Sequence, residues 1–403
     1  MMKEWLKESV RGEPCLIYSV LLLFCLHIYP QPTSSESLVV AESNLVLGGN
    51  TSTTQFNAGA SRIPVAWSGS GFALSYYDHA PIEGNQGQYL LLMNGDADLL
   101  SPPIRVAEET SWLSKVLWDG STYLSLIGRE GMLHMKRFLP NGVLVAERTL
   151  TMPGDRGSEF EVSLDGEVLR VIRCDGGRAV VMDYSIDGER LSDPNRLSLQ
   201  GELERPILLT NDLAVLSRSI SMYRPEGFTA SVSLEIFDGF RNQIAAPLVI
   251  SVETTQLGSL CWNGRDFVCL GERRTQGGRV SVEAFHFDRQ GRQIGNGVEI
   301  GSVPSGVEAD LTSEVIWTGD TYVVIWDQGV EKWREDVYVR VLDENCLPIT
   351  PPLRINPVPL HQVAHGTVLT DNGLVVFTVE SGKTNPSIVY TRVVGEGVLL
   401  PKN

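Results

Sequence analysis

Three short segments rich in basic and acidic side chains, two of them with an aromatic residue, suit ligand binding. The densest spans 327–336 and contains Trp333, a second spans 272–274, and a third spans 218–226. An exposed Trp or Tyr stacks on a sugar ring or anchors a peptide, while Arg and carboxylate groups supply hydrogen bonds. The alternative is a set of solvated charged loops that keep the protein soluble. The candidate ligand-binding residues are Trp333, Arg334, Glu335, Asp336, Asp327, Arg273, Arg274, Tyr223 and Arg224.

Paired carboxylates are a second candidate chemistry, because two acids about 5–10 Å apart across a pocket can hydrolyse a glycosidic bond. Asp78 and Glu83, together with Asp327 or Glu335, could converge on a central channel. The chain contains 49 acidic residues, so such pairs also arise by chance, and nothing in the spacing requires one. Catalysis therefore stays open, and a non-catalytic protein is the favoured interpretation.

Metal and cofactor chemistry has no supporting motif. His361 and His365 lie four positions apart in a segment without helical character, and on a strand they would stand about 13 Å apart. Segment 94–98 (Asn-Gly-Asp-Ala-Asp) is faintly similar to a calcium loop, but it lacks the later Gly and Glu and falls on an expected hairpin turn. The sequence also lacks nucleophile-elbow, zinc-protease, phosphate-loop, dinucleotide-binding and sialidase-type motifs. We predict no metal and no cofactor.

Composition bounds the class of protein. The 403 residues include 33 Lys+Arg and 49 Asp+Glu, so the net charge is 33 − 49 = −16 at pH 7. This acidic balance argues against nucleic-acid binding, which needs a basic surface. Hydrophobic residues make up 42% and charged residues 20%, as in ordinary globular proteins. The 39 Gly and 21 Pro indicate many turns.

The first 35 residues differ from the rest of the chain. Cys15–Tyr29 is an uncharged apolar run that ends before Pro30 and Pro32. Its length fits the apolar region of a signal peptide better than a membrane-spanning helix, which needs about 20 residues. An uncleaved signal anchor is the alternative. Residues 36–403 would then form one exported domain, secreted or in the cell envelope (periplasmic or extracellular), without membrane contact beyond that anchor.

An internal repeat dominates residues 36–403. Each strong copy consists of an apolar strand, a Trp, a Gly-containing turn, an aromatic residue and a second apolar strand. Segment 118–123, for example, reads Trp-Asp-Gly-Ser-Thr-Tyr. Weaker copies place Leu at the anchor position, and the intervals between anchors are 51, 46, 45, 53, 55 and 52 residues. The seven anchors are Trp67, Trp118, Leu164, Leu209, Trp262, Trp317 and Leu369.

Each repeat accommodates four short strands joined by turns rich in Asp, Asn and Gly, which tolerate positive φ. Seven such units predict an all-β, seven-bladed β-propeller of four-stranded antiparallel blades. A TIM barrel would need helices, and a single sandwich would not show the seven intervals. The sequence resembles the Trp-x-Gly-x-x-Tyr repeat propellers of exported bacterial proteins. That resemblance implies a binding face at the channel mouth, built partly from the loops between the second and third strands.

Three structural details follow from the repeat. The seventh unit lacks an outer strand, so we expect Leu45–Leu47 to supply it and to close the ring by pairing the two ends of the chain. The repeated Trp residues should pack between blades or cover turns. Cys261 should face Val268 and not Cys269, which excludes a disulfide between Cys261 and Cys269.

The functional prediction combines these observations. We expect an exported, non-catalytic propeller, most simply a monomer, that binds a glycan or a protein partner through its loop face. A propeller-type glycoside hydrolase or polysaccharide lyase is one alternative, and a structural subunit of a cell-surface assembly is another. The sequence identifies neither the ligand nor a reaction.

Overall fold

The described residues of the computed structural model lie within the unit Ser37–Asn403, and they form strands and no helix. The predicted leader, residues 1–35, lies outside the described part. Among the described residues, no helix is long and apolar enough to cross a membrane. The described residues are 37–48, 56–57, 63–78, 87–108, 114–129, 131–151, 159–175, 178–197, 205–210, 213–224, 227–238, 242–243, 248–250, 254–274, 279–303, 313–331, 334–356, 363–380 and 387–395.

The strands form seven antiparallel sheets, which we number as blades 1 to 7. Blade 1 contains β2 (Phe56–Asn57), β3 (Val65–Trp67), β4 (Gly71–Asp78), β5 (Gly87–Asn94) and β6 (Ile104–Ala107). Blade 2 contains β7 (Ser114–Trp118), β8 (Tyr123–Arg129), β9 (Met132–Phe138) and β10 (Leu144–Leu150). Blade 3 contains β11 (Glu159–Asp165), β12 (Val168–Asp175), β13 (Arg178–Ser185) and β14 (Asn195–Leu197).

The remaining blades follow in chain order. Blade 4 contains β15 (Arg205–Leu209), β16 (Leu213–Arg224), β17 (Gly227–Asp238), β18 (Asn242–Gln243) and β19 (Leu248–Ile250). Blade 5 contains β20 (Thr254–Trp262), β21 (Asp266–Arg274), β22 (Val280–Asp288) and β23 (Val298–Val303). Blade 6 contains β24 (Ser313–Trp317), β25 (Tyr322–Glu331), β26 (Arg334–Leu342) and β27 (Leu353–Arg354). Blade 7 contains β28 (Val363–Thr370), β29 (Gly373–Glu380), β30 (Ser387–Gly395) and β1 (Leu38–Gly48).

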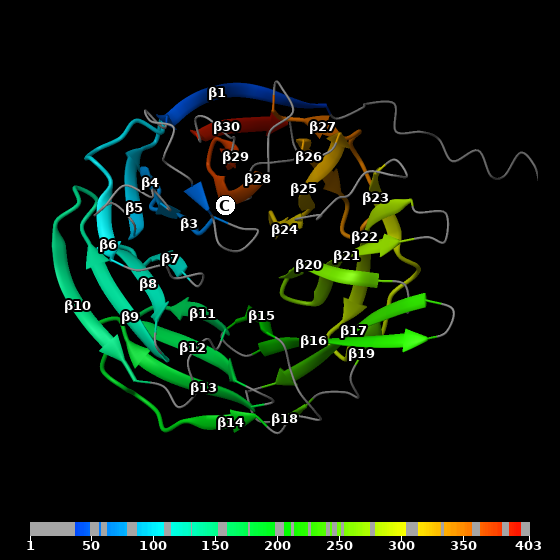
Figure 1. The fold of residues 1–403 in the computed structure, drawn as a ribbon, viewed down its shortest axis with the longest axis horizontal. Coiled ribbons are helices and arrows are strands. Elements are labelled where there is room, and N and C mark those ends of the chain that lie inside the picture. Colours follow the sequence, from blue (N-terminus) through cyan, green and yellow to red (C-terminus); the bar gives the residue numbers. More distant parts are fainter. Residues whose placement is uncertain are drawn as a thin grey trace, which may run out of the picture. The chain divides into compact units, whose positions relative to one another are not determined.

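The sheets follow one another around a ring, with the first strand of each repeat on the inside (Figure 1). Strand β1, from the beginning of the unit, pairs with β30 near its end and completes blade 7. The predicted ring closure is therefore confirmed. A second contact closes the ring near its centre, because the Ile63 amide donates to the His365 carbonyl of β28 at 2.9 Å. The chain is a seven-bladed β-propeller, as the seven repeats predict.

Apolar side chains fill the space between every pair of neighbouring blades. Seven clusters of buried hydrophobic residues occur in the described part of the chain, and each joins two consecutive blades, including blades 7 and 1. Successive residues of a strand point to opposite faces of its sheet. The middle strands of each blade therefore carry buried apolar residues on both faces, because each face contacts a neighbour.

The turns between first and second strands are built alike in the four strong repeats. A polar residue follows the Trp, and its side-chain oxygen accepts a hydrogen bond from the backbone amide three positions later. The next residue is glycine with φ between 90° and 109°, a conformation that other residues adopt only with strain. We call this end of the blades the turn end. The glycines are Gly69, Gly120, Gly264 and Gly319.

The anchor residue of each repeat pairs across the first two strands with the residue five positions later. The seven pairs are Trp67–Phe72, Trp118–Tyr123, Leu164–Leu169, Leu209–Ala214, Trp262–Phe267, Trp317–Tyr322 and Leu369–Leu374. In the four Trp pairs, the ring centroids lie 4.4–4.8 Å apart. Each Trp packs against the cluster shared with the preceding blade. The repeated Trp residues are thus packing residues, as expected.

Tyrosine hydroxyls tie some blades to their predecessors at the same end. The Tyr123 hydroxyl donates to the Gly71 carbonyl of blade 1 at 2.7 Å, and the Asn263 amide of blade 5 donates to the Tyr322 hydroxyl at 2.7 Å. The described cysteines are all free thiols, and Cys261 pairs with Val268 while Cys269 pairs with Leu260. The two thiols therefore lie on opposite faces of blade 5, as predicted.

Candidate functional site

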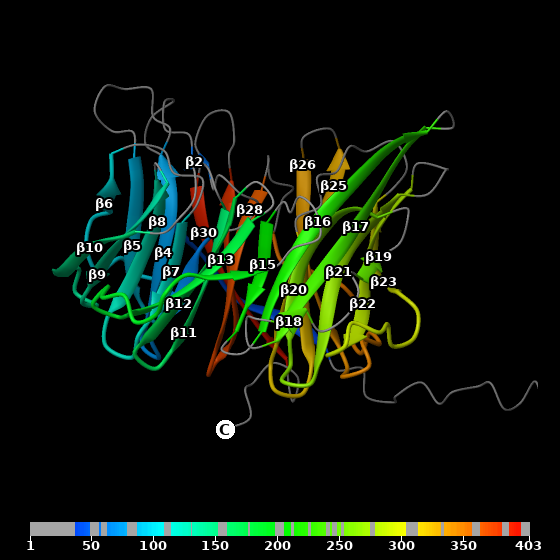
Figure 2. The same ribbon diagram turned by 90° about the horizontal axis from the view of Figure 1, so that it is seen from below.

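The candidate ligand-binding residues lie at the opposite end of the blades, where second and third strands connect. We call this the hairpin end (Figure 2). The expectation that segments 218–226 and 327–336 form loops is wrong, because their described residues continue as paired strands. Strand β16 ends at Arg224 and β25 ends at Glu331. Cross-strand pairing continues along both segments, and this accounts for the difference between the expected loops and the observed strands.

The nine candidates are distributed over three consecutive blades. Tyr223 and Arg224 end β16, Arg273 and Arg274 end β21, and Asp327 lies within β25. The first residues of β26 are Arg334, Glu335 and Asp336. Trp333 lies outside the described residues, between β25 and β26 in the sequence. The structure therefore brings all three segments to the same end of blades 4 to 6.

Asp336 is buried and holds the outer strand of blade 6 in place. Its Oδ1 atom lies 3.0 Å from Arg354 Nη2 on β27 and accepts a hydrogen bond from Asn356 Nδ2 at 3.1 Å. Asn356 in turn accepts a hydrogen bond from the Val337 amide at 2.7 Å through its own Oδ1. The carboxylate thus has a structural role, and Arg354 remains half-exposed beside it.

Asp327 does not join Asp336 in a common site. Asp327 pairs with Val337 in the ladder and Gln328 pairs with Asp336, so the two carboxylates point to opposite faces of blade 6. The Asp327 face continues the apolar residues that pack against blade 7, and the Asp336 face turns towards blade 5. The segment 327–336 therefore contributes Asp327 and Asp336 to two different interfaces.

Arg273 contacts an acid of its own blade. Its Nη1 atom lies 3.2 Å from Oε1 of Glu283 on β22, and Glu283 is buried while Arg273 is half-exposed. Nearby, Arg279 Nη2 lies 2.6 Å from Glu299 Oε1 on β23, and both side chains are exposed. Blade 5 therefore presents two Arg–Glu pairs at its hairpin end. Of the other predicted acids, Glu83 lies outside the described residues, and no side chain is described for Asp78.

An aromatic pair in blade 6 was missed by the sequence reasoning. Trp326 and Tyr338 face each other across β25 and β26 with ring centroids 5.4 Å apart and an angle of 18°. Trp326 is buried against Gly301 of blade 5, where a Cβ atom would lie 2.8 Å from its ring. Tyr338 is only partly buried. Burial raises the pKa of its hydroxyl, and the neighbouring Asp336 raises it further.

A signal for Tyr338 exists in the sequence. Along β26, Asp336, Tyr338 and Arg340 alternate with three valines. Such alternation predicts one polar and one apolar face on a strand. The ladder then places Arg354 of β27 opposite Tyr338. The polar face of blade 6 therefore carries a ring, a cation and a carboxylate close together.

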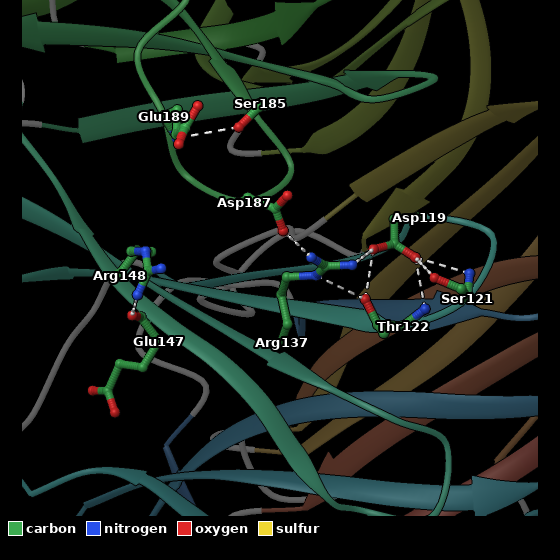
Figure 3. A network of polar contacts seen from close by, with 9 residues as sticks. All are labelled: Asp119, Ser121, Thr122, Arg137, Glu147, Arg148, Ser185, Asp187 and Glu189. Atoms are coloured by element: carbon green, nitrogen blue, oxygen red, sulfur yellow. Dashed lines mark hydrogen bonds and ion pairs between the residues drawn. The ribbon is translucent and has the colours of Figure 1, made fainter.

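Polar groups at the turn end serve a different purpose (Figure 3). Arg137 of β9 lies between two blades, with Nη2 at 3.2 Å from Asp119 Oδ2 and Nη1 at 2.5 Å from Asp187 Oδ1 of blade 3. Burial raises the pKa of Asp119, but hydrogen bonds from Thr122 and Ser121 outweigh it and leave that pKa below its usual value. This network links blades 2 and 3.

Two segments carry weak metal-binding patterns, 94–98 and the pair His361 and His365. In the described part of the chain, no group of three or more His, Cys, Asp and Glu residues is arranged to hold a metal ion. Segment 94–98 is a hairpin turn, in which Asn94 Oδ1 accepts hydrogen bonds from the Asp96 and Asp98 amides. His365 is buried on β28, and His361 lies outside the described residues.

No family model and no curated protein matches this sequence. Among solved structures, the chain is similar to the Dos1 propeller, with 11% identity over 87% of this chain and 95% of that one, at a TM-score of 0.45. It is similar to the periplasmic gluconolactonase of Pseudomonas aeruginosa, with 15% identity over 84% and 99%, at 0.42. It is also similar to the neuraminidase-like protein of subtype N10 from A/little yellow-shouldered bat/Guatemala/060/2010, with 10% identity over 89% and 100%, at 0.39. The fold of this chain rests on its own strand pairing.

Proposed function

We propose that this chain is an exported, non-catalytic propeller that binds a carbohydrate at the hairpin end of blade 6. The observation that carries the proposal is the group formed by Tyr338, Arg354 and Asp336. A partly exposed ring lies beside an Arg–carboxylate pair with an N···O distance of 3.0 Å. The leader-like residues 1–35 and the resemblance to exported repeat propellers support export.

The chemistry of this group suits a sugar. The C–H face of a pyranose stacks on an aromatic ring, and its vicinal hydroxyls accept from a guanidinium and donate to a carboxylate. The Trp326 ring stacks on the Tyr338 ring, and Trp326 is itself packed against Gly301. A ring that is already held in place loses little conformational freedom on binding. Trp333 and Arg334, next to one another in the sequence before Asp336, are candidates to contact a second sugar.

The test uses the full chain mixed with a panel of soluble and insoluble polysaccharides. Protein depletion from the supernatant and released sugar are measured in the same tubes. We expect depletion without product, and we expect Tyr338→Ala and Arg354→Ala each to reduce binding at least tenfold. The triple variant with Ala at Trp333, Arg334 and Arg273 should also bind less.

Blade 1 offers a matched control. Tyr76 and Tyr89 form the corresponding stacked pair there, with centroids 5.5 Å apart and an angle of 19°. Tyr89→Ala removes the same ring from an equivalent position, so it should change stability as Tyr338→Ala does but leave carbohydrate binding intact. Equal loss of binding in both variants would contradict a site in blade 6.

Two other outcomes would favour the alternative functions. Released sugar would favour the hydrolase or lyase alternative and make the acids near the channel the next targets. If the protein is not depleted and no sugar is released, the result would favour a protein partner or a structural role in a cell-surface assembly. A pull-down from the native envelope would then identify that partner.

A further inference from the structure

The charge balance around Tyr338 limits which sugars can bind beside its ring. Arg354 lies opposite Tyr338 in the ladder, and its Nη2 atom is 3.0 Å from Oδ1 of Asp336. The Arg354 side chain is 37% exposed, whereas that of Asp336 is only 5% exposed. A ligand that stacks on Tyr338 therefore meets a cation whose charge is already balanced by a buried carboxylate.

Asp336 is held in this position by its other contacts. Its Oδ1 atom also accepts from Nδ2 of Asn356 at 3.1 Å, and Oδ1 of Asn356 is fixed by the Val337 amide at 2.7 Å. Asp336 and Asn356 are both buried. Burial and the nearby Asp336 together raise the pKa of the Tyr338 hydroxyl, so this carboxylate lies close to the ring's polar edge. The negative charge is a fixed part of the site.

The neighbouring arginines of blades 5 and 6 are also engaged. Arg340, deeper on β26, donates to two backbone carbonyls through Nε and Nη1. The two arginines described at the hairpin end of blade 5 each contact a glutamate. These pairs are Arg273–Glu283 at 3.2 Å and Arg279–Glu299 at 2.6 Å. The described side chains of this surface therefore carry no excess positive charge, in a chain whose net charge is −16.

We propose that the ligand is a neutral polysaccharide and that Asp336 is the residue that excludes acidic ones, an inference that rests on the carbohydrate site proposed above. A uronic acid carries a carboxylate where the corresponding hexose has its C6 alcohol. Beside Tyr338 that carboxylate would compete with Asp336 for Arg354, and the two negative charges would repel each other at short range. A sugar hydroxyl accepts a hydrogen bond from Arg354 without this repulsion.

The test compares polymers that differ only in this charge. Binding of the full chain to a β-glucan, a mannan and a galactan is measured before and after oxidation of their C6 alcohols to carboxylates. The salt concentration is roughly 0.15 M, where charges more than about 8 Å from the ligand are largely screened. We expect a neutral polymer to bind about tenfold or more tightly than its oxidised form.

The two ways of failing are distinguishable. Equal or tighter binding of the oxidised polymers overturns this inference and leaves carbohydrate binding standing. If the chain binds neither form of any of these polymers, the proposed function is contradicted as well.

Asp336→Asn tests the residue itself. The variant keeps the shape of the side chain and an oxygen that accepts from Asn356, but it leaves Arg354 as an unbalanced cation. The preference for the neutral polymer should therefore fall by roughly threefold or more. Asp96→Asn is the matched control, because Asp96 is exposed at the turn end and its replacement changes the net charge by the same single unit.

The control should keep the wild-type preference. Equal shifts in the two variants, or an unchanged preference in Asp336→Asn, overturn the assignment of Asp336. Melting temperatures verify that both variants are folded. If Asp336→Asn does not fold, the comparison of polymers on the wild type still tests the inference.

Discussion

The two ends of the same second strands follow different rules. At the turn end, the residue paired with each anchor is buried in all seven blades: Phe72, Tyr123, Leu169, Ala214, Phe267, Tyr322 and Leu374. Four positions further along, at the hairpin end, the corresponding residues are Tyr76, Ile127, Arg173, Arg218, Gly271, Trp326 and Thr378. The first set is uniformly apolar, and the second ranges from Gly to Arg and Trp.

This difference separates a structural end from a variable one. Near the anchors, each blade must fit the same gap against its predecessor, so one side-chain class recurs. At the hairpin end, the contacts differ from one blade interface to the next. The rings of Trp326 and Tyr338 stack in blade 6, for example, whereas Arg173 contacts the Gly131 carbonyl of blade 2. Specific binding requires residues that differ between blades, and these occur at the hairpin end.

The largest expected effect is at the turn end. Tyr123→Ala removes a fully buried ring between blades 1 and 2, together with its hydrogen bond to Gly71, so it should lower the free energy of unfolding by about 3–5 kcal/mol. Urea unfolding followed by circular dichroism measures this change. Tyr338→Ala at the hairpin end should cost clearly less. If the two variants are equally destabilised, the comparison between the ends fails.

A smaller effect is expected from the backbone of the turns. Gly319→Ala forces φ near 109° on a residue with a Cβ atom, and should cost about 1–2 kcal/mol although the added carbon meets no neighbour within 4 Å. Gly95→Ala is the control, since Gly95 has no positive φ and a Cβ there makes ordinary contacts. Equal melting temperatures for the two variants would show that the turn conformation is not required.

The Asp119 network predicts a pH dependence. Its folded pKa lies below the usual value of 3.8, so its contribution to stability is present above that value and is lost as the pH falls through the lower, folded pKa. Asp119→Asn should therefore be less stable than the wild type at neutral pH, and the difference should shrink under acidic conditions. Urea midpoints measured from pH 7 downwards check this. A difference that is constant with pH would exclude the ionised carboxylate as its source.

The smallest effect on stability should come from an exposed ion pair at the hairpin end. Arg279 and Glu299 are both exposed, so Arg279→Ala should change the free energy of unfolding by about 0–1 kcal/mol. The same urea series measures it. A loss comparable to that of Gly319→Ala would mean that the hairpin end is as tightly specified as the turn end.

The sequence by itself determined the number of blades, their strand order and the ring closure. The number of blades and the strand order are local features, because a turn of four residues and an anchor paired five positions later repeat often enough to be recognised without any long-range contact. The ring closure joins β1 to the distant β30, and it was predicted because the seventh repeat lacks an outer strand. The same reasoning correctly separated Cys261 from Cys269, because one known pair in a ladder sets the face of every residue nearby. It also located the candidate residues at one end of blades 4 to 6.

Only the tertiary structure decided how those candidates are grouped. The β16–β17 and β25–β26 hairpins are longer than expected, so the segments expected as loops are strands. Because side chains alternate along a strand, Asp327 and Asp336 lie on opposite faces of blade 6. Tyr338 on β26 stacks with Trp326 of β25 and lies opposite Arg354 of β27. Such features depend on which strand neighbours which, and short-range sequence patterns do not encode that.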